Sequence, residues 1–421
     1  MINNIFPEDT KKWASKLSKY ISAQLLVQFF GLACGILLIR NLSKQEYAYF
    51  TLANSLQGSM NVLASSGIIS ALSAIGGKVW QDPFRFSQLV STAMRLRLRL
   101  ATVSAAAVSP ILLFLLLKNG ASLGYSLFLI VGILIELALY LRNSIWQVVL
   151  QLNTKINQIQ KVELLGSGSR LALLAISNTI LSAGLGVFIS TLASGFQYTA
   201  LKKQVKDLLN SKAPIHKEDH REIKRLILLQ LPSSLFFCIQ GQLTVILISF
   251  FGNTQNIAEI GALSRLAVIF SLIMSIMTNI VLPSFARCQS KYELRKRYFQ
   301  ILAAYAGFSG ILIFLIATFP SKFLFVLGSQ YSNLEQEIIL MAVSQTVTAL
   351  STVLWNINST KGWIELSWLF PPAIILTQIA LLLFLDISTV RGVIIFSTLS
   401  IMPASCLNFV MTYKGMKTIS G

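Results

Sequence analysis

The stretch "LLIRNLSKQEYAYFTLANSLQ", residues 37–57, decides the fold of this chain. An apolar run stops at Arg40, the chain stays polar through Glu46, and an apolar and aromatic run then begins at once. A polar interval this short is either a loop inside a soluble core or the hairpin between two membrane spans. The composition of the whole chain decides between the two.

The chain is very apolar and poor in charge. It has 421 residues, of which 54% are hydrophobic and 12% are charged, and its mean hydropathy is +0.67. Soluble domains carry roughly 25% charged residues. The composition therefore excludes an ordinary soluble protein and indicates a membrane protein with several spans.

Apolar segments long enough to cross a bilayer recur along the whole chain. A span needs roughly 20 apolar residues, and about twelve segments meet that requirement. They are residues 17–39, 46–74, 97–117, 122–149, 160–181, 183–201, 225–250, 258–283, 298–319, 334–358, 364–385 and 390–413. The sequence thus predicts an all-α polytopic membrane protein with about 12 transmembrane helices.

The basic residues indicate how these spans are oriented. The net charge is +19, which in a soluble protein would suggest nucleic acid, but in a membrane protein indicates basic cytoplasmic loops near anionic lipids. With a cytoplasmic N-terminus, 27 of the 35 Lys and Arg residues fall in inner loops, including the arginines of "RLRLRL" at 95–100. Five fall outside: Arg40, Lys44, Lys118, Lys322 and Arg391. We therefore expect both termini in the cytoplasm, residues 40–45 as an outer hairpin, and no nucleic-acid partner.

The longest polar segment, "KKQVKDLLNSKAPIHKEDHREIK" at 202–224, follows the sixth span. It divides the chain into an N-terminal six-helix bundle (1–201), a cytoplasmic linker loop (202–224) and a C-terminal six-helix bundle (225–421). A weak repeat supports this division, because "RNLSKQEYAYFTLA" follows the first span and "FGNTQNIAEIGALSRLA" follows the seventh. Repeated halves around a central pathway are common in secondary transporters.

No catalytic constellation stands out. The two histidines, His216 and His220, lie in the central loop, no cysteine pair has CxxC spacing, and "GSGSR" at 166–170 lacks the phosphate-loop pattern. We read the small residues of "GSGSR" as helix-packing positions. We expect no enzymatic activity, no cofactor and no metal site.

The "RLRLRL" stretch has two interpretations. On a helix, Arg95 and Arg99 share one face and Arg97 points away from it. The stretch is either a basic anchor at the start of the third span or a phosphate-attracting rim at the cytoplasmic mouth.

The informative residues are charges inside spans, because burying a charge is costly and marks a functional site by default. They are Glu136, Arg142, Glu163, Arg170 and Arg265. Glu136 and Arg170 can simply pair and hold two helices together, and Arg142 and Glu163 can extend to the cytoplasmic interface. Arg170 and Arg265 are the deepest cations and come from different halves, so both can face a central cavity.

A guanidinium group in a wet cavity suits phosphate, which it binds through two parallel hydrogen bonds. The in-span arginines therefore predict an anionic substrate. We expect Arg170, Arg265, Arg142 and Glu136 to bind it.

Two stretches resemble a known family. They are "RNLSKQEYAYFTLANSLQGSMNVLASSGI" and "FFGNTQNIAEIGALSRLAVIFSLIMSIMTNIVLPSFAR", the second followed by the basic "KYELRKRYF". Both resemble Wzx-type O-antigen and polysaccharide flippases of the multidrug/oligosaccharidyl-lipid/polysaccharide exporter superfamily. The resemblance extends to the span count, the central loop and Pro283. Ala48 and Leu263 depart from it, since the family often has Gly and Tyr there.

This resemblance implies two six-helix bundles around a central cavity in the bacterial inner membrane. It implies translocation of an undecaprenyl-pyrophosphate-linked oligosaccharide, an O-antigen or capsule repeat unit, from the cytoplasmic to the outer leaflet by alternating access. The implied partners are the lipid-linked oligosaccharide, membrane lipids, a coupling ion (H⁺ or Na⁺) and a glycan polymerase. The hairpin at 40–45 would be an outer gate.

Two alternatives remain from the residues alone. One is an ion-coupled exporter of a small anionic metabolite or drug in the same superfamily. The other is a membrane glycan polymerase or ligase, which the short outer loops disfavour.

Overall fold

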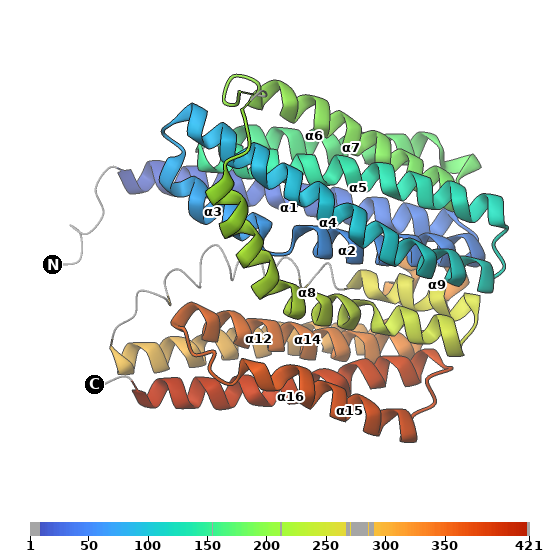
Figure 1. Ribbon diagram of the computed structural model, residues 1–421. Helices are drawn as coiled ribbons and strands as arrows, with labels where there is room; N and C mark the ends of the chain where they lie inside the picture. The colour runs from blue at the N-terminus through green and yellow to red at the C-terminus, as the bar shows by residue number, and fades with distance from the viewer. Residues whose placement is uncertain are drawn as a thin grey trace. The chain divides into compact units, whose positions relative to one another are not determined.

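The computed structural model describes residues 9–153, 155–210, 213–266, 270, 285 and 290–418 (Figure 1). The described residues form helices, turns and short connections, with no strand among them. Contacts divide the chain into two compact units, Met1–Leu243 and Thr244–Gly421, and the boundary falls inside one long helix, α8.

The N-terminal unit is built from long helices that run side by side (Figure 1). They are α1 (Asp9–Asn41), α2 (Lys44–Ser65), α3 (Ile68–Val79), α4 (Pro83–Lys118), α5 (Leu123–Leu152), α6 (Ile156–Ile176), η1 (Asn178–Ile180), α7 (Ala183–Val205) and the first part of α8 (Lys217–Phe251). Helix α5 packs against α2, α4 and α7, while α6 packs against α1 and α7. Helix α5 therefore packs against three long helices on one side, while Phe128, Val131 and Ile135 are exposed on its other side.

The C-terminal unit contains the end of α8 and a second set of helices. They are α9 (Thr254–Leu263), η2 (Ser264–Leu266), α12 (Lys291–Thr318), α13 (Pro320–Leu327), η4 (Ser329–Tyr331), α14 (Glu335–Lys361), η5 (Ser367–Leu369), α15 (Phe370–Phe384) and α16 (Val390–Thr418). Helix α14 packs against α12 and α16, and α15 packs against α16.

Polar residues at the predicted turns become helix caps. The side chain of Ser43 accepts a hydrogen bond from the Glu46 amide at 3.2 Å, and Asp82 accepts from Phe84 and Arg85 at 3.0 Å each. Such caps satisfy the amides that the first helical turn leaves without partners. Asp82 starts α4 well before residue 97, where the apolar run begins, so "RLRLRL" lies inside this helix.

Eight helices among the described residues are long and apolar enough to span a membrane. They contain residues 22–41, 83–118, 123–152, 234–251, 291–318, 335–361, 367–384 and 390–417. The protein is therefore a multi-pass membrane protein. Helices α2, α6 and α7 coincide with predicted spans but are not among the eight. Most of the predicted span 258–283 lies outside the described residues, so the count of twelve stays a prediction.

The predicted span 46–74 is not one helix, because the chain breaks between α2 and α3 at Gly67. Gly67 has φ +72°, and a Cβ atom there would lie 2.8 Å from backbone atoms of Leu226 and Ile227 in α8. Only glycine combines this backbone conformation with so close an approach. The break therefore results from tertiary packing, which apolar length does not reveal.

The segment 202–224 lies against α4. Arg85 forms two parallel hydrogen bonds with the Asp219 carboxylate, at 2.5 and 2.6 Å. The Asn210 amide donates to Ser87 Oγ at 2.9 Å, and the His216 amide donates to Thr92 Oγ1 at 3.1 Å. These contacts fix the described part of the segment to the N-terminal unit. Its role as a linker between two bundles stays a prediction.

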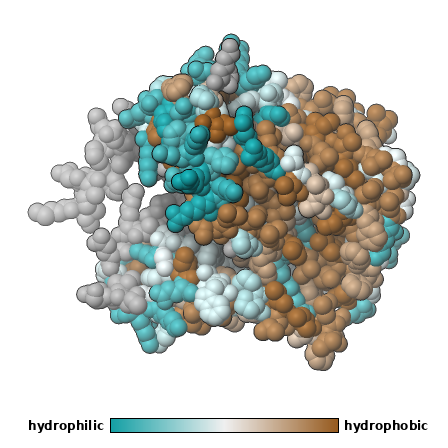
Figure 2. All heavy atoms as spheres, viewed as in Figure 1, coloured by the Kyte–Doolittle hydropathy of each residue, from teal (hydrophilic) through white to brown (hydrophobic). Residues whose placement is uncertain are grey.

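The surface is consistent with a lipid environment. Large apolar side chains are exposed on the long helices, among them Phe29 (62% exposed) on α1 and Phe384 (84% exposed) on α15. Figure 2 shows hydrophobic side chains over most of one face, with hydrophilic ones gathered near the ends where α4 and α8 begin. Exposed apolar surface on this scale would be a liability in water but is expected in a bilayer.

Candidate functional site

Charged and amide side chains from three helices meet inside the N-terminal unit. Glu136 comes from α5, Arg170 from α6 and Gln57 from α2. Gln57 is buried and lies within hydrogen-bonding reach of the Glu136 carboxylate, and the Arg170 guanidinium acts on that carboxylate electrostatically. Arg170 thus acts on the Glu136 carboxylate through its charge. Their interpretation as an ion pair between two helices stays a prediction.

Arg170 has spare hydrogen-bonding capacity. Its side chain is partly buried, and its Nε atom is buried with no acceptor among the described residues. A buried donor without an acceptor costs about 1–3 kcal/mol, so such groups are rare and call for an explanation. The arrangement can bind an anion, because a guanidinium group has several N–H groups to donate and the Nε atom of Arg170 has no acceptor among the described residues.

Small residues bring α7 close to the same face of α6. Glu163, Gly166 and Arg170 are spaced by three and four residues and therefore share that face. A Cβ atom at Gly166 would overlap the side chain of Gln197 from α7, and Gln147 Nε2 of α5 donates to Glu163 Oε1 at 3.3 Å. The packing role predicted for "GSGSR" is confirmed at Gly166.

Arg142 lies about two turns after Glu136 in α5 and is partly buried. Its Nη1 atom donates to the Ala138 carbonyl of its own helix at 3.2 Å. The structure does not bring Arg142 into an ion pair with a described carboxylate. Its predicted contact with substrate stays a prediction.

Arg265 lies in η2 of the C-terminal unit and is partly buried. The η2 turn packs against α14. Arg170 belongs to the other unit, so the prediction that these two arginines face one cavity remains a prediction.

Arg97, which the distribution of basic residues placed in an inner loop, is instead a buried residue of α4. Its side chain is 1% exposed and donates to Ser65 Oγ of α2 at 2.7 Å and to the Leu141 carbonyl of α5 at 3.1 Å. Arg95 and Arg99 are exposed on the opposite face, as predicted. The Asp82-Pro83 helix start indicates that residue 97 lies several turns inside α4, but it does not indicate that the side chain is buried.

Residues 37–57 form part of a hydrogen-bonded cluster at one end of the N-terminal unit. Glu46 Oε2 of α2 accepts hydrogen bonds from the Tyr125 hydroxyl at 2.6 Å and from the Ala183 amide at 2.7 Å. The Tyr125 hydroxyl also accepts from the Gly184 amide at 3.0 Å. One carboxylate thus ties together the starts of α2, α5 and α7. The hairpin is part of a hydrogen-bonded cap on this unit, and its role as a gate stays a prediction.

Solved structures with the same arrangement of helices are membrane transporters. No family model matches the chain, and no curated protein matches it. An inward-facing multidrug resistance MATE family transporter of the MOP superfamily has a TM-score of 0.72 at 15% identity, over 94% of this chain and 96% of that one. The lipid II flippase MurJ, in an inward closed conformation, has a TM-score of 0.70 at 13% identity, over 95% of this chain and 89% of that one. A MATE structure in complex with MaD3S has a TM-score of 0.65 at 16% identity, over 96% of each chain. Nearly the whole chain therefore has the fold shared by MATE transporters and a lipid II flippase.

Proposed function

We propose that this protein is a flippase for an undecaprenyl-pyrophosphate-linked oligosaccharide, an O-antigen or capsule repeat unit. It moves that unit from the cytoplasmic to the outer leaflet of the bacterial inner membrane by alternating access. The fold it shares with a lipid II flippase supports this class of function. The resemblance of its hairpins to O-antigen flippases supports the narrower choice of substrate.

The observation that carries the proposal is Arg170. Its buried Nε atom has no acceptor among the described residues, and its guanidinium acts electrostatically on Glu136, which Gln57 reaches through a hydrogen bond. A pyrophosphate supplies oxygen acceptors in the geometry that a guanidinium fork fits. In this mechanism the pyrophosphate takes the place of Glu136 at Arg170.

Displacement of Glu136 provides a route to ion coupling. Once Arg170 turns to the pyrophosphate, the Glu136 carboxylate is left without its cation in a partly buried site. A buried carboxylate without a cation favours binding of H⁺ or Na⁺. Arg142 and Arg265 would add positive charge along the path, while the glycan would contact amide side chains such as Gln57.

The remaining parts of the proposal concern location and partners. Both termini lie in the cytoplasm, in accordance with the excess of Lys and Arg in the predicted inner loops. Membrane lipids surround the apolar helix faces, and a glycan polymerase receives the translocated unit on the outer side.

The test is the fate of the lipid-linked oligosaccharide in the source cells. Deletion of the gene should trap finished lipid-linked units at the cytoplasmic face while their synthesis continues. Reintroduced Arg170→Ala and Arg265→Ala should fail to restore translocation at normal protein level. Arg99→Ala removes an exposed arginine from α4 and should restore it fully. If the units reach the outer face normally in the deletion strain, the flippase proposal is wrong.

A second candidate is an ion-coupled exporter of a small anionic metabolite or drug. The Arg170 guanidinium supports it equally, because its Nε–H, which has no acceptor among the described residues, suits any organic anion. Purified protein in proteoliposomes distinguishes the two candidates. Ion-gradient-driven uptake of a small organic anion, lost in Arg170→Ala and accompanied by normal flipping in the deletion strain, would support the exporter.

A further inference from the structure

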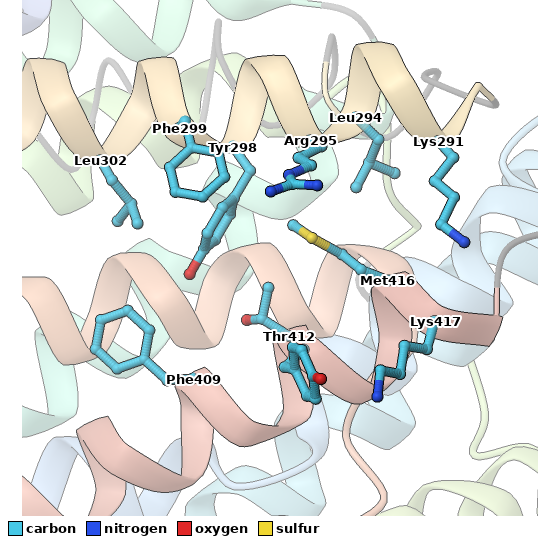
Figure 3. Close-up of a pocket in the computed structure, with 11 residues that line it drawn as sticks. Lys291, Leu294, Arg295, Tyr298, Phe299, Leu302, Phe409, Thr412, Met416 and Lys417 are labelled. Atoms are coloured by element: carbon cyan, nitrogen blue, oxygen red, sulfur yellow. The ribbon is translucent and has the colours of Figure 1, made fainter.

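A cavity of about 570 Å³ lies in the C-terminal unit, between the start of α12 and the end of α16 (Figure 3). Its volume falls within the roughly 300–1,000 Å³ typical of ligand sites. It belongs to neither the Glu136 and Arg170 cluster nor the Glu46 cap, both of which lie in the N-terminal unit. It therefore requires its own explanation.

The cavity is cationic at one end and apolar at the other. Lys291 and Arg295 of α12 and Lys417 of α16 lie toward the charged ends of their helices, and Figure 3 shows Phe299, Leu302 and Phe409 toward the other end. Helix α12 enters its apolar part after residue 297, and α16 leaves its apolar part before residue 414. Helices α12 and α16 form the two walls of the cavity, and both walls therefore change from cationic to apolar in the same direction.

Each wall carries a cation over an aromatic ring. The Arg295 guanidinium lies 5.8 Å from the Phe299 ring centroid, and Lys417 Nζ lies 4.3 Å from that of Tyr413. Such contacts hold a cation against apolar surface while its other donors stay available. The cationic end of the cavity therefore has positive charges fixed beside hydrophobic groups.

The floor between the two walls is buried and carries hydroxyl groups. Leu294, Tyr298 and Thr412 are 1%, 6% and 2% exposed. The Tyr298 hydroxyl lies within hydrogen-bonding reach of Thr412, whose own hydroxyl donates to Asn358 Oδ1 of α14 at 2.8 Å. The floor is thus fixed to a third helix and places hydroxyl groups between the charged and apolar parts.

We propose that this cavity binds one anionic glycerophospholipid from the surrounding bilayer. Its phosphate lies among Lys291, Arg295 and Lys417, and an acyl chain lies along Phe299, Leu302 and Phe409. Basic pockets between transmembrane helices at the cytoplasmic side bind anionic head groups. The apolar half favours a lipid over a free anion, because inorganic phosphate would leave that half unoccupied.

The local charge balance agrees with an anionic ligand. Residues 291–297 contain Lys291, Arg295, Lys296 and Arg297 against a single acid, Glu293, and the end of α16 adds Lys414 and Lys417. Within this basic cluster, cations that line the cavity can be compared with cations that do not. Lys296 and Lys414 are exposed on the same two helices but do not line it.

The experiment is native mass spectrometry of the full-length protein in detergent, titrated with phosphatidylglycerol or with phosphatidylcholine of the same acyl chains. We expect tighter binding of phosphatidylglycerol. Arg295→Gln with Lys417→Gln should weaken it roughly 25-fold, since each cation near the surface contributes about fivefold. The control, Lys296→Gln with Lys414→Gln, removes the same charge and should leave the affinity nearly unchanged, because neither residue lines the cavity.

A second variant tests the apolar half without changing any charge. Leu302→Trp should fill that half and weaken phosphatidylglycerol binding, and inorganic phosphate alone should not compete. The proposal is overturned if the control pair loses as much affinity as the wall pair, or if phosphatidylcholine binds as tightly as phosphatidylglycerol. Competition by millimolar inorganic phosphate would also overturn it, because the site would then be an anion site and not a lipid site.

Discussion

The two units tie their helices together at matching positions with different chemistry. In the N-terminal unit, Glu46 is the third residue after the Ser43 cap and reaches the Ala183 amide at the start of α7. In the C-terminal unit, Asn256 is the third residue after the Asn253 cap, and its Nδ2 atom donates to the Ser388 carbonyl just before α16 at 2.9 Å. The third residue after each cap thus contacts the beginning of another helix of its own unit, α7 in one case and the residues just before α16 in the other.

A second pair of hydrogen bonds joins helices near their first residues in the same way. Tyr125, near the start of α5, contacts Gly184 near the start of α7. Glu337, near the start of α14, accepts a hydrogen bond at 2.5 Å from Arg391 near the start of α16. In both units the hydrogen bonds join helices near their first residues, but the residues that form these bonds differ. These differences in chemistry agree with a sequence repeat that is weak.

The interiors differ more than the ends. In the N-terminal unit, Arg97, Glu136 and Arg170 place charges among α2, α4, α5 and α6. In the described part of the C-terminal unit, α14 and α16 are joined by neutral amides, with Asn358 Nδ2 donating to the Asn408 carbonyl at 2.9 Å. The C-terminal unit is not free of interior charge, because Glu259 is 8% exposed and Arg265 is partly buried.

The largest effect is expected from Arg97→Ala, which breaks the charged interior of the N-terminal unit. The substitution removes a fully buried side chain and its contacts with Ser65 and Leu141. We expect a loss of about 3–5 kcal/mol in the free energy of unfolding, typical of removing a large buried side chain. Unfolding in detergent titrated with a denaturing detergent measures it. Arg99→Ala should stay within about 0.5 kcal/mol, and equal losses would show that Arg97 is not a buried tie.

The next effect compares two glycines with the same backbone conformation. Gly67 and Gly362 have φ +72° and +74°, but a Cβ atom at Gly67 meets α8 whereas one at Gly362 has open space. Gly67→Ala should cost about 2–4 kcal/mol from backbone strain and overlap together, and Gly362→Ala about 1 kcal/mol from strain alone. Gly77→Ala, in open space within α3, should be neutral or slightly stabilising. Similar costs at Gly67 and Gly362 would contradict the close approach of α8.

A third prediction compares how much the contacts of Glu46 and of Asn256 contribute to stability. Glu46→Ala removes a carboxylate that accepts two hydrogen bonds, and we expect a loss of about 2–3 kcal/mol in the free energy of unfolding. Asn256→Ala removes one neutral hydrogen bond to Ser388 and should cost about 1 kcal/mol. Thermal unfolding of both variants in one detergent measures the difference. A larger loss for Asn256→Ala would reverse the comparison.

The smallest effect is expected at the second tie of the C-terminal unit. The Arg391 side chain is about half exposed, so its pair with Glu337 is screened by solvent. Arg391→Gln should cost about 0.5 kcal/mol, and the loss should shrink further at high salt. A loss that does not depend on salt would mean that packing and not charge dominates this contact.

The sequence by itself determined the all-helical membrane class and the places of most spans. These follow from local properties. A run of about twenty apolar residues indicates a membrane span, and a charge within it is costly, whatever the tertiary packing around them. The tertiary structure alone decided the break at Gly67, the burial of Arg97 and the ties made by Glu46 and Asn256. Each of these depends on an approach between segments far apart in the chain, which no local pattern of residues encodes.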